Sequence, residues 1–286
     1  MIDKTMVIRM EKALGLTRKI VGIRFLYTWA EHQDCPWPTY KRKVRFCVMT
    51  ADAAQGRHFK CEPANFACGR SRKALGIDEN DLLTESGEIF YSCGLYGSRA
   101  IAKQAQDNTL FIRQKLYGAE IGPLSEMEEA DMVLLYGDAY QMMRLVQGYT
   151  YTFGPPKNIS SVGNQGVCSD LCGRPFTTND LNISFLCEGA RRACGWSRND
   201  IGAGMPASRF PGVANGIVQT LNLIDRPEEK DKILARLDDP AELGVGIDKK
   251  AYYGVSCGAW YEKRDDDRRR YEDHLRESAA GKEEAL

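Results

Sequence analysis

One segment of the chain occurs twice, and this repetition restricts the fold more than any other feature. Cys61–Gly76 aligns without gaps on Cys187–Gly202, and nine of the 16 aligned pairs are identical, where average composition would give roughly one. Both copies contain the pattern Cys-Glu-x-Ala-x-x-Ala-Cys-Gly-x-Ser-Arg. Self-similarity of this kind indicates a duplicated structural unit. We therefore expect an internally duplicated chain, built as two similar lobes or around one pseudo-twofold axis.

Hydrophobic periodicity around each copy predicts strands that alternate with helices. The predicted strands lie at 20–26, 58–61, 88–91, 132–136 and 182–187, and the predicted helices at 3–14, 44–54, 64–75, 139–147, 167–172, 190–198, 211–223 and 228–237. Residues 28–43 are rich in proline and are expected to form a loop. Strands alternating with helices indicate an α/β fold with helices covering a sheet. We expect two pseudo-symmetric strand–helix halves, at 1–125 and 126–260, followed by a charged helix or tail at 261–286.

Charge and hydropathy exclude several classes of function. The 39 basic and 39 acidic residues balance, which argues against binding nucleic acid by bulk neutralisation of phosphates. The chain lacks a run of about 18 apolar residues, and its first residues do not resemble a signal peptide. We therefore expect a cytoplasmic protein without a membrane span. In a reducing compartment, ten cysteines and only three histidines favour thiolate-binding metals, in the form of an iron–sulfur cluster or zinc.

The repeat sorts the cysteines into two sets of four, which is the number that a [4Fe–4S] or [2Fe–2S] cluster or a Cys₄ zinc site requires. The first set is Cys47, Cys61, Cys68 and Cys93, and the second is Cys172, Cys187, Cys194 and Cys257. Cys35 and Cys168 remain, one for each half. Cys168 precedes Cys172 by four residues, so both thiols share one helical face, and Cys168 is also a candidate metal ligand.

The repeated polar residues suggest a supporting role near the candidate ligands. Ser71 and Arg72 recur as Ser197 and Arg198, and such side chains can donate hydrogen bonds to cluster sulfurs or to an anionic substrate. Helix capping and salt bridging are the alternative roles. Packing is the alternative for the cysteines, since free cysteine is among the most buried residue types. The spacings of a compact ferredoxin, a zinc finger and a Cys-x-x-Cys redox motif are absent from the sequence.

The segment Val21–Leu26, followed by Cys47, Phe59–Cys61 and Leu75-Gly76, resembles the archaeal and bacterial family called domain of unknown function 169. The resemblance extends over residues 15–225 and leaves the charged end of the chain uncovered. It implies a soluble cytoplasmic protein of the kind often found in anaerobes. The family has no established reaction, so the resemblance implies no catalytic residue.

Three hypotheses of function follow from the sequence. The first is an iron–sulfur protein with one or two clusters, most simply [4Fe–4S], that acts in electron transfer or in a reductive step of anaerobic metabolism. Either each half supplies four thiolates, or both halves share one cluster through Cys61, Cys68, Cys187 and Cys194. The second is a zinc-stabilised scaffold or an assembly factor for a metal or cluster. The third is a ligand-binding protein with structural cysteines. The expected partner is a redox or metabolic enzyme, a homo-oligomer is compatible with the sequence, and whether the chain is itself an enzyme stays open.

Overall fold

Alternate side chains of strand β4 (Met132–Gly137) enter two separate cores. Met132, Leu134 and Tyr136 belong to one cluster of buried residues, whereas Val133 and Leu135 belong to another. Successive side chains of a strand point to opposite faces of a sheet, so β4 is buried from both sides. A sheet built around such a strand needs helices on both faces.

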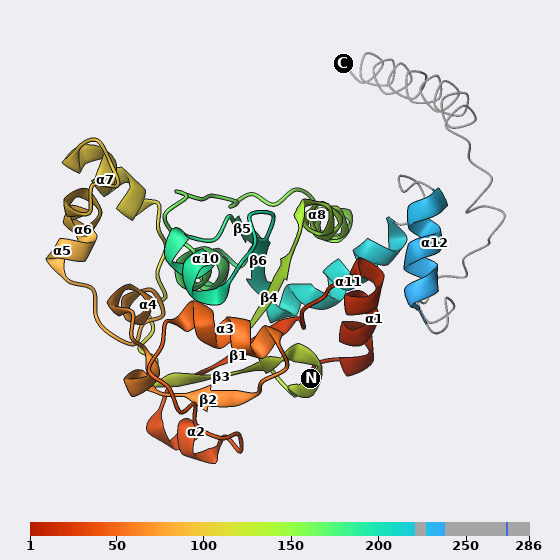
Figure 1. Cartoon of the computed structure of the whole chain (residues 1–286), viewed down its shortest axis with the longest axis horizontal. Helices are drawn as coiled ribbons and strands as arrows, with labels where there is room; N and C mark the ends of the chain where they lie inside the picture. Colours follow the sequence, from red (N-terminus) through yellow and green to blue (C-terminus); the bar gives the residue numbers. More distant parts are fainter. Residues whose placement is uncertain (221–226, 238–272, 274–286) are drawn as a thin grey trace, which may run out of the picture.

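The computed structural model describes residues 1–220, 227–237 and Asp273, and a six-stranded antiparallel sheet forms its centre (Figure 1). The strands are β1 (Val21–Leu26), β2 (Phe59–Cys61), β3 (Gly118–Pro123), β4, β5 (Asn182–Ser184) and β6 (Ile201–Pro206), in the order β2-β3-β1-β4-β6-β5. The predicted combination of helices with a sheet is confirmed. Cys257 lies outside the described residues, as does the predicted tail at 261–286 apart from Asp273.

The two sides of the sheet have the same strand order when read outward from the central β1–β4 pair. These two strands pair antiparallel about Gly22 and Val133. The first residue of β1 pairs with Pro123 at the end of β3, and the first residue of β4 pairs with Pro206 at the end of β6. Outermost, β2 pairs with β3 and β5 pairs with β6. Strand order and register therefore match on the two sides.

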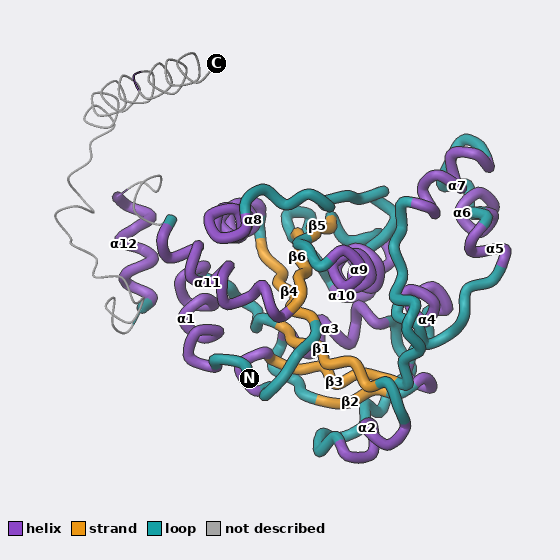
Figure 2. Tube along the Cα trace, turned by 180° about the vertical axis from the view of Figure 1, so that it is seen from behind, coloured by secondary structure: helices purple, strands orange, loops and turns teal. Residues whose placement is uncertain are grey.

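Helices cover both faces of this sheet (Figures 1 and 2). One face carries α3 (Phe46–Ala54), α4 (Gly69–Ala74), the π-helical turn η3 (Val167–Gly173), α9 (Arg174–Thr178) and α10 (Glu188–Cys194). The other carries α1 (Lys4–Leu14), α8 (Ala139–Phe153) and α11 (Phe210–Gln219), and α12 (Pro227–Arg236) packs on α1. Within the described ranges, no helix combines the length and the apolar character that a bilayer crossing demands.

Short helices complete the described chain. They are α2 (Trp29–Asp34), α5 (Leu82–Glu85), α6 (Glu88–Ser92), α7 (Arg99–Asp107) and the 3₁₀ turns Pro63–Asn65, Leu124–Glu126 and Ala207–Arg209. Helices α5, α6 and α7 form an arm that lies apart from the sheet, beyond α4 (Figure 1). The arm has a small core of its own around Phe90, Ala102 and Ala105.

Glycines in β3 and β6 allow other backbone segments to lie directly against these strands. A Cβ atom at Gly204 in β6 would lie 2.0 Å from the carbonyl oxygen of Leu171 in η3. A Cβ atom at Gly118 in β3 would lie 2.1 Å from the carbonyl oxygen of Cys61. Only glycine permits such approaches. The absence of a side chain at Gly204 therefore brings η3, which carries two cysteines, onto the sheet.

Several sequence predictions differ from the structure. Strands β3 and β6 were not predicted, because glycine is depleted in strands and hid their pattern. The segment predicted as a strand at 88–91 is helix α6, and the predicted loop at 28–43 contains α2, which begins at a capping box on Thr28. The helix predicted at 64–75 divides into a 3₁₀ turn and α4.

The two copies of the repeated segment adopt different local structures. The first copy begins at the end of β2, turns at Pro63–Asn65 and reaches its helix only at Gly69, whereas the second enters α10 at Glu188. Their positions on the sheet also differ. Cys61 pairs with the second residue of β3, and the residue that pairs with the second residue of β6 is Ser184, three positions before Cys187. The alignment of Cys61 with Cys187 is therefore not an equivalence in the sheet.

Candidate thiol site

Five partly buried cysteines converge on one face of the sheet. Cys47 is the second residue of α3, Cys68 is the N-cap of α4, Cys168 lies in η3, Cys187 is the N-cap of α10 and Cys194 ends α10. Cys68, Cys187 and Cys47 lie close enough to Cys168 to raise the pKa of its thiol. We call these five residues the thiol site.

Close backbone packing brings the segments of the thiol site together. A Cβ atom at Gly166, immediately before η3, would lie 3.1 Å from the Cys187 sulfur. The Arg45 side chain, at the N-cap of α3, donates a hydrogen bond of 2.8 Å to the carbonyl oxygen of Gly189 in α10. These contacts join η3, α10 and α3, whose cysteines come from distant parts of the sequence.

Cys47 and Cys194 are in direct contact. The Cys47 thiol donates a hydrogen bond to the Cys194 sulfur, which raises the pKa of Cys47 and lowers the pKa of Cys194. Trp196 also contributes to the lowered pKa of Cys194, although its indole Nε1 is buried without a hydrogen-bond partner among the described atoms. The Trp196 ring is stacked on Tyr136 at 4.6 Å between centroids, so its position is fixed.

Burial and the neighbouring cysteines disfavour the ionised forms of Cys168 and Cys187. Burial is the largest cause of the raised pKa of Cys168 and of Cys187, and the neighbouring cysteines add to both shifts. These two thiols therefore keep their protons near neutral pH. A bound metal takes thiolates, so binding would release these protons.

Arg70 lies beside three of the thiols, and its hydrogen-bond partners are neutral. It has charge–charge interactions with Cys168, Cys68 and Cys187. Its Nη2 donates to Gln106 Oε1 at 2.8 Å, and its Nε donates to Gln165 Oε1 at 3.2 Å. The Phe90 ring covers the guanidinium, with Cζ at 3.8 Å from the ring centroid. Arg70 is partly exposed, and within the described ranges no carboxylate pairs with it.

Gln165, which lies beside Arg70, has a hydrogen-bond donor without an acceptor. Its side chain is 3% exposed, and its Oε1 accepts hydrogen bonds from Arg70 and from Ser169 Oγ at 2.8 Å. Its Nε2 is buried without a partner among the described atoms. A buried amide nitrogen without an acceptor costs free energy. Arg70 and Gln165 together supply donors and positive charge that suit an anionic group.

The remaining candidate ligands lie elsewhere. Cys61 and Cys172 are fully buried in the core beneath the site, and Cys61 donates to the Ala119 carbonyl oxygen at 3.3 Å. Cys35 is buried beside Glu120, and Cys93 is exposed on the arm. The structure therefore brings together Cys47 and Cys68 of the first predicted set, Cys187 and Cys194 of the second, and Cys168.

The repeated serines and arginines have structural contacts. The motif residue that approaches the thiols is the one between Gly and Ser, which differs between the two copies. Ser71 Oγ donates to the Cys68 carbonyl oxygen at 2.7 Å, and Arg72 Nη2 pairs with Asp78 at 2.7 Å. Ser197 Oγ accepts from the Asn199 backbone, and Arg198 is exposed. The residue between Gly and Ser in the motif is Arg70 in one copy and Trp196 in the other. Sequence comparison of the copies could not single out this position, because the two residues differ.

Asp170 anchors η3 and gives a prediction for the pH dependence of stability. Its Oδ2 accepts from Ser184 Oγ at 2.9 Å, and burial raises the pKa of this carboxyl group to about 6 from an ordinary 3.8. The folded state therefore binds the proton more tightly than the unfolded state, so stability falls as the pH rises from about 4 to about 6. Relative to wild type, we expect Asp170→Asn to gain about 2 kcal/mol of unfolding free energy across that interval.

Urea unfolding of the apo protein at several pH values measures this difference. Asp78→Asn is the matched control with the opposite sign, because Arg72 lowers the pKa of Asp78. Its ion pair stabilises the fold at neutral pH and is lost as the pH falls, so Asp78→Asn should lose stability relative to wild type as the pH rises. A parallel pH course for the two variants would contradict the assignment.

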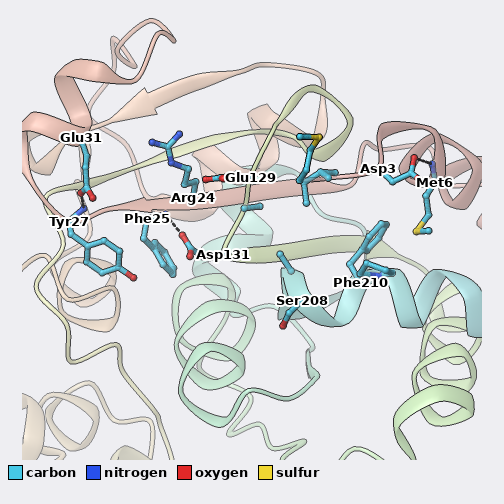
Figure 3. Close-up of a pocket in the computed structure, with 15 residues that line it drawn as sticks. Asp3, Met6, Arg24, Phe25, Tyr27, Glu31, Glu129, Asp131, Ser208 and Phe210 are labelled. Carbon is cyan, nitrogen blue, oxygen red and sulfur yellow. Dashed lines mark hydrogen bonds between the residues drawn. The ribbon is translucent and has the colours of Figure 1, made fainter.

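A separate cavity of about 500 Å³ lies beside β1 and the start of α11 (Figure 3). Asp131 faces it and accepts a hydrogen bond of 2.6 Å from the backbone nitrogen of Phe25. Carboxylates of Asp3, Glu31, Glu129 and Asp131 line it with the single guanidinium of Arg24. Burial, Glu129 and Glu31 raise the pKa of Asp131. This cavity shares no lining residue with the thiol site, and its negative charge disfavours an anionic group.

The thiol spacing bears on which metal the site can take. Among the described residues, no group of three or more His, Cys, Asp and Glu side chains is arranged to hold one metal ion. A mononuclear zinc site requires four ligands within about 2.3 Å of one centre, hence thiolates about 3.8 Å apart. In a [4Fe–4S] cluster each cysteine binds a different iron, so the thiolates are spread around a larger centre.

Comparisons with known proteins place the chain in a family. Residues 9–216 match the model of domain of unknown function 169, described as an uncharacterised ArCR family. The match includes all five cysteines of the thiol site. Neither the curated proteins nor the solved structures contain a match to the chain. Because the family model covers most of its length, the chain belongs to the family of domain of unknown function 169.

Proposed function

We propose that the protein binds one [4Fe–4S] cluster through Cys47, Cys68, Cys168 and Cys187 and acts in electron transfer or in a reductive step of anaerobic metabolism. The observation that carries the proposal is the convergence of these free thiols, three of them beside Arg70, a cation for which the described residues supply no carboxylate. Four thiolates and a positive neighbour match the ligand number and the negative charge of such a cluster.

The four proposed ligands are linked to one another through Cys168. Cys168 interacts with the other three, and Cys187 interacts with Cys47 and Cys68. Cys194 interacts with Cys47 and Cys187. We assign Cys194 and Trp196 to the surroundings of the cluster, where a thiol and an indole N–H can tune the properties of Cys47.

The residues of this chain would bind the cluster, shield it from water and keep it accessible to a partner. The thiols provide the ligands, the core beneath them excludes water, and the partial exposure of all five cysteines keeps the site near the surface. A bound cluster supplies one-electron chemistry. A site near the surface suits exchange of electrons with a redox or metabolic enzyme, which is the partner we propose, in the cytoplasm.

We also propose that the chain arose by internal duplication. The matching strand order and register on the two sides of the β1–β4 pair support this idea. The different local structures of the two motif copies fit a duplication followed by divergence. One half then came to contribute Cys47 and Cys68, and the other Cys168 and Cys187, to a single shared site.

Anaerobic isolation or reconstitution with ferrous iron and sulfide tests the proposed function. We expect iron and acid-labile sulfide in equal amounts, with an EPR signal that appears or disappears on reduction with dithionite. Stoichiometric zinc without sulfide would favour the scaffold alternative. A colourless protein that takes up neither metal would leave the cysteines as packing residues and refute the proposal.

A further inference from the structure

Arg70 is a cation for which the described residues supply no carboxylate partner. The guanidinium group stays protonated in proteins, and taking it out of water is costly unless an anion accompanies it. Its two hydrogen-bond partners, Gln106 and Gln165, are neutral amides. Cys168, Cys68, Tyr96 and Cys187 lie near it.

The residues around Arg70 hold it in place over the thiols. Phe90 of the arm covers one side of the guanidinium at 3.8 Å, and Gln106 of α7 accepts from Nη2. Gln165, two positions before η3, accepts from Nε and is itself fixed by Ser169. Arg70 is thus fixed from both the arm and the η3 segment, and thermal motion to the solvent would break all these contacts.

Gln165 provides an independent sign that a further hydrogen-bond acceptor belongs at this site. It is 3% exposed, and its Nε2 has no partner among the described residues, although its Oε1 has two. The amide orientation is consistent with this network, because Oε1 has to face the two donors. Nε2 therefore remains as a buried donor beside the segment that carries Cys168.

We propose that Arg70 and Gln165 donate hydrogen bonds to the sulfur atoms of the bound cluster and that Arg70 sets its reduction potential. This inference rests on the proposed function. A cation next to the cluster stabilises the reduced form, which carries one more negative charge, more than the oxidised form. Arg70 therefore raises the potential, and Gln165 adds to the effect through a neutral hydrogen bond. Phe90 and Gln106 are positioning residues that hold Arg70.

The test compares Arg70→Met with Arg72→Met in the full chain. Arg72 lies in the same helix but pairs with Asp78, so it is a matched control for removing one arginine. Midpoint potentials are measured by EPR-monitored redox titration of the reconstituted protein. We expect Arg70→Met to lower the potential by the equivalent of a tenfold change in the reduction equilibrium, which is 59 mV for one electron. Arg72→Met should leave the potential unchanged.

The apo protein supplies a readout that does not depend on the cluster. Thermal unfolding of the apo variants reports the structural contribution of each arginine. A purely structural Arg70 would lower the apo melting temperature and leave the potential of the reconstituted protein unchanged, which would overturn the inference. Failure of wild type to take up a cluster would instead refute the proposed function, so the two failures are distinguishable.

Gln165→Leu keeps the inference testable if Arg70→Met does not fold. This variant removes the unused donor and retains the cation. We expect it to lower the potential by less than Arg70→Met, with the cluster still bound. An unchanged potential in Gln165→Leu would show that no hydrogen bond reaches the cluster from this side, and it would overturn the role assigned to Gln165.

Discussion

Replacing Cys168 and Cys187 together by serine is expected to abolish cluster binding. Each of these two residues interacts with at least three other cysteines of the thiol site. Serine retains the size of cysteine but is a poor ligand for iron. Iron and sulfide in the reconstituted double variant should fall to background, and the EPR signal should disappear. Far-UV circular dichroism establishes that the fold persists.

The control variants distinguish this ligand set from the one that the sequence predicts. Cys93→Ser changes an exposed thiol of the arm, and Cys61→Ala changes a buried thiol that bonds to a backbone carbonyl group. Both residues belong to the first predicted set, yet they lie outside the thiol site. We expect both variants to retain the cluster. Loss of the cluster in either variant would show that the ligand assignment is wrong.

Replacing Gly204 by alanine is expected to lower the unfolding free energy of the apo protein by about 3 kcal/mol. The new Cβ atom would lie 2.0 Å from the carbonyl oxygen of Leu171, which is a backbone atom and cannot rotate away. Strand β6 and η3 would have to separate. Because η3 carries Cys168, the same change should also weaken cluster uptake. Urea unfolding measures the first effect, and iron content after reconstitution measures the second.

Gly97→Ala is the matched control for this substitution. A Cβ atom at Gly97 meets no other atom within 4 Å, so stability and cluster uptake should stay close to those of wild type. If Gly204→Ala were as stable as Gly97→Ala, close packing of η3 on β6 would not be what fixes Cys168. The thiol site would then owe its geometry to the contacts of α3 and α10.

The sequence predicts the parts of the fold that depend on local patterns. The apolar run of β1 and the helix α1 both form as predicted, and α1 is capped by Asp3 and ends before Gly15. The missed strands β3 and β6 contain glycines at positions where another backbone passes, and this approach is a tertiary contact that leaves no periodic signal. Helix α6 was predicted as a strand because Ile89 to Tyr91 have high strand propensity, which the packing of Phe90 in the arm overrides.

The sequence predicts the cysteines of the thiol site as candidate ligands, but it does not predict which of them lie together in the fold. All five cysteines are candidates in the sequence, but neither the two sets assigned by chain order nor the shared set with Cys61 matches the group that the fold brings to one face of the sheet. Arg70 and Gln165 gave no signal in the sequence. An arginine is recognised as lacking a counter-charge, and a glutamine as lacking an acceptor, only when their surroundings are known in three dimensions.

The outermost strands of the sheet, β2 and β5, offer little opportunity for aggregation by strand pairing. Both β2 and β5 are only three residues long. The backbone of Lys60 in β2 already pairs with the segment at Pro38 and Tyr40, and the Asn182 side chain in β5 binds the backbone of Ser160. Short edges that are already occupied give an incoming strand little to pair with. Growth into cross-β assemblies is therefore disfavoured in the apo protein.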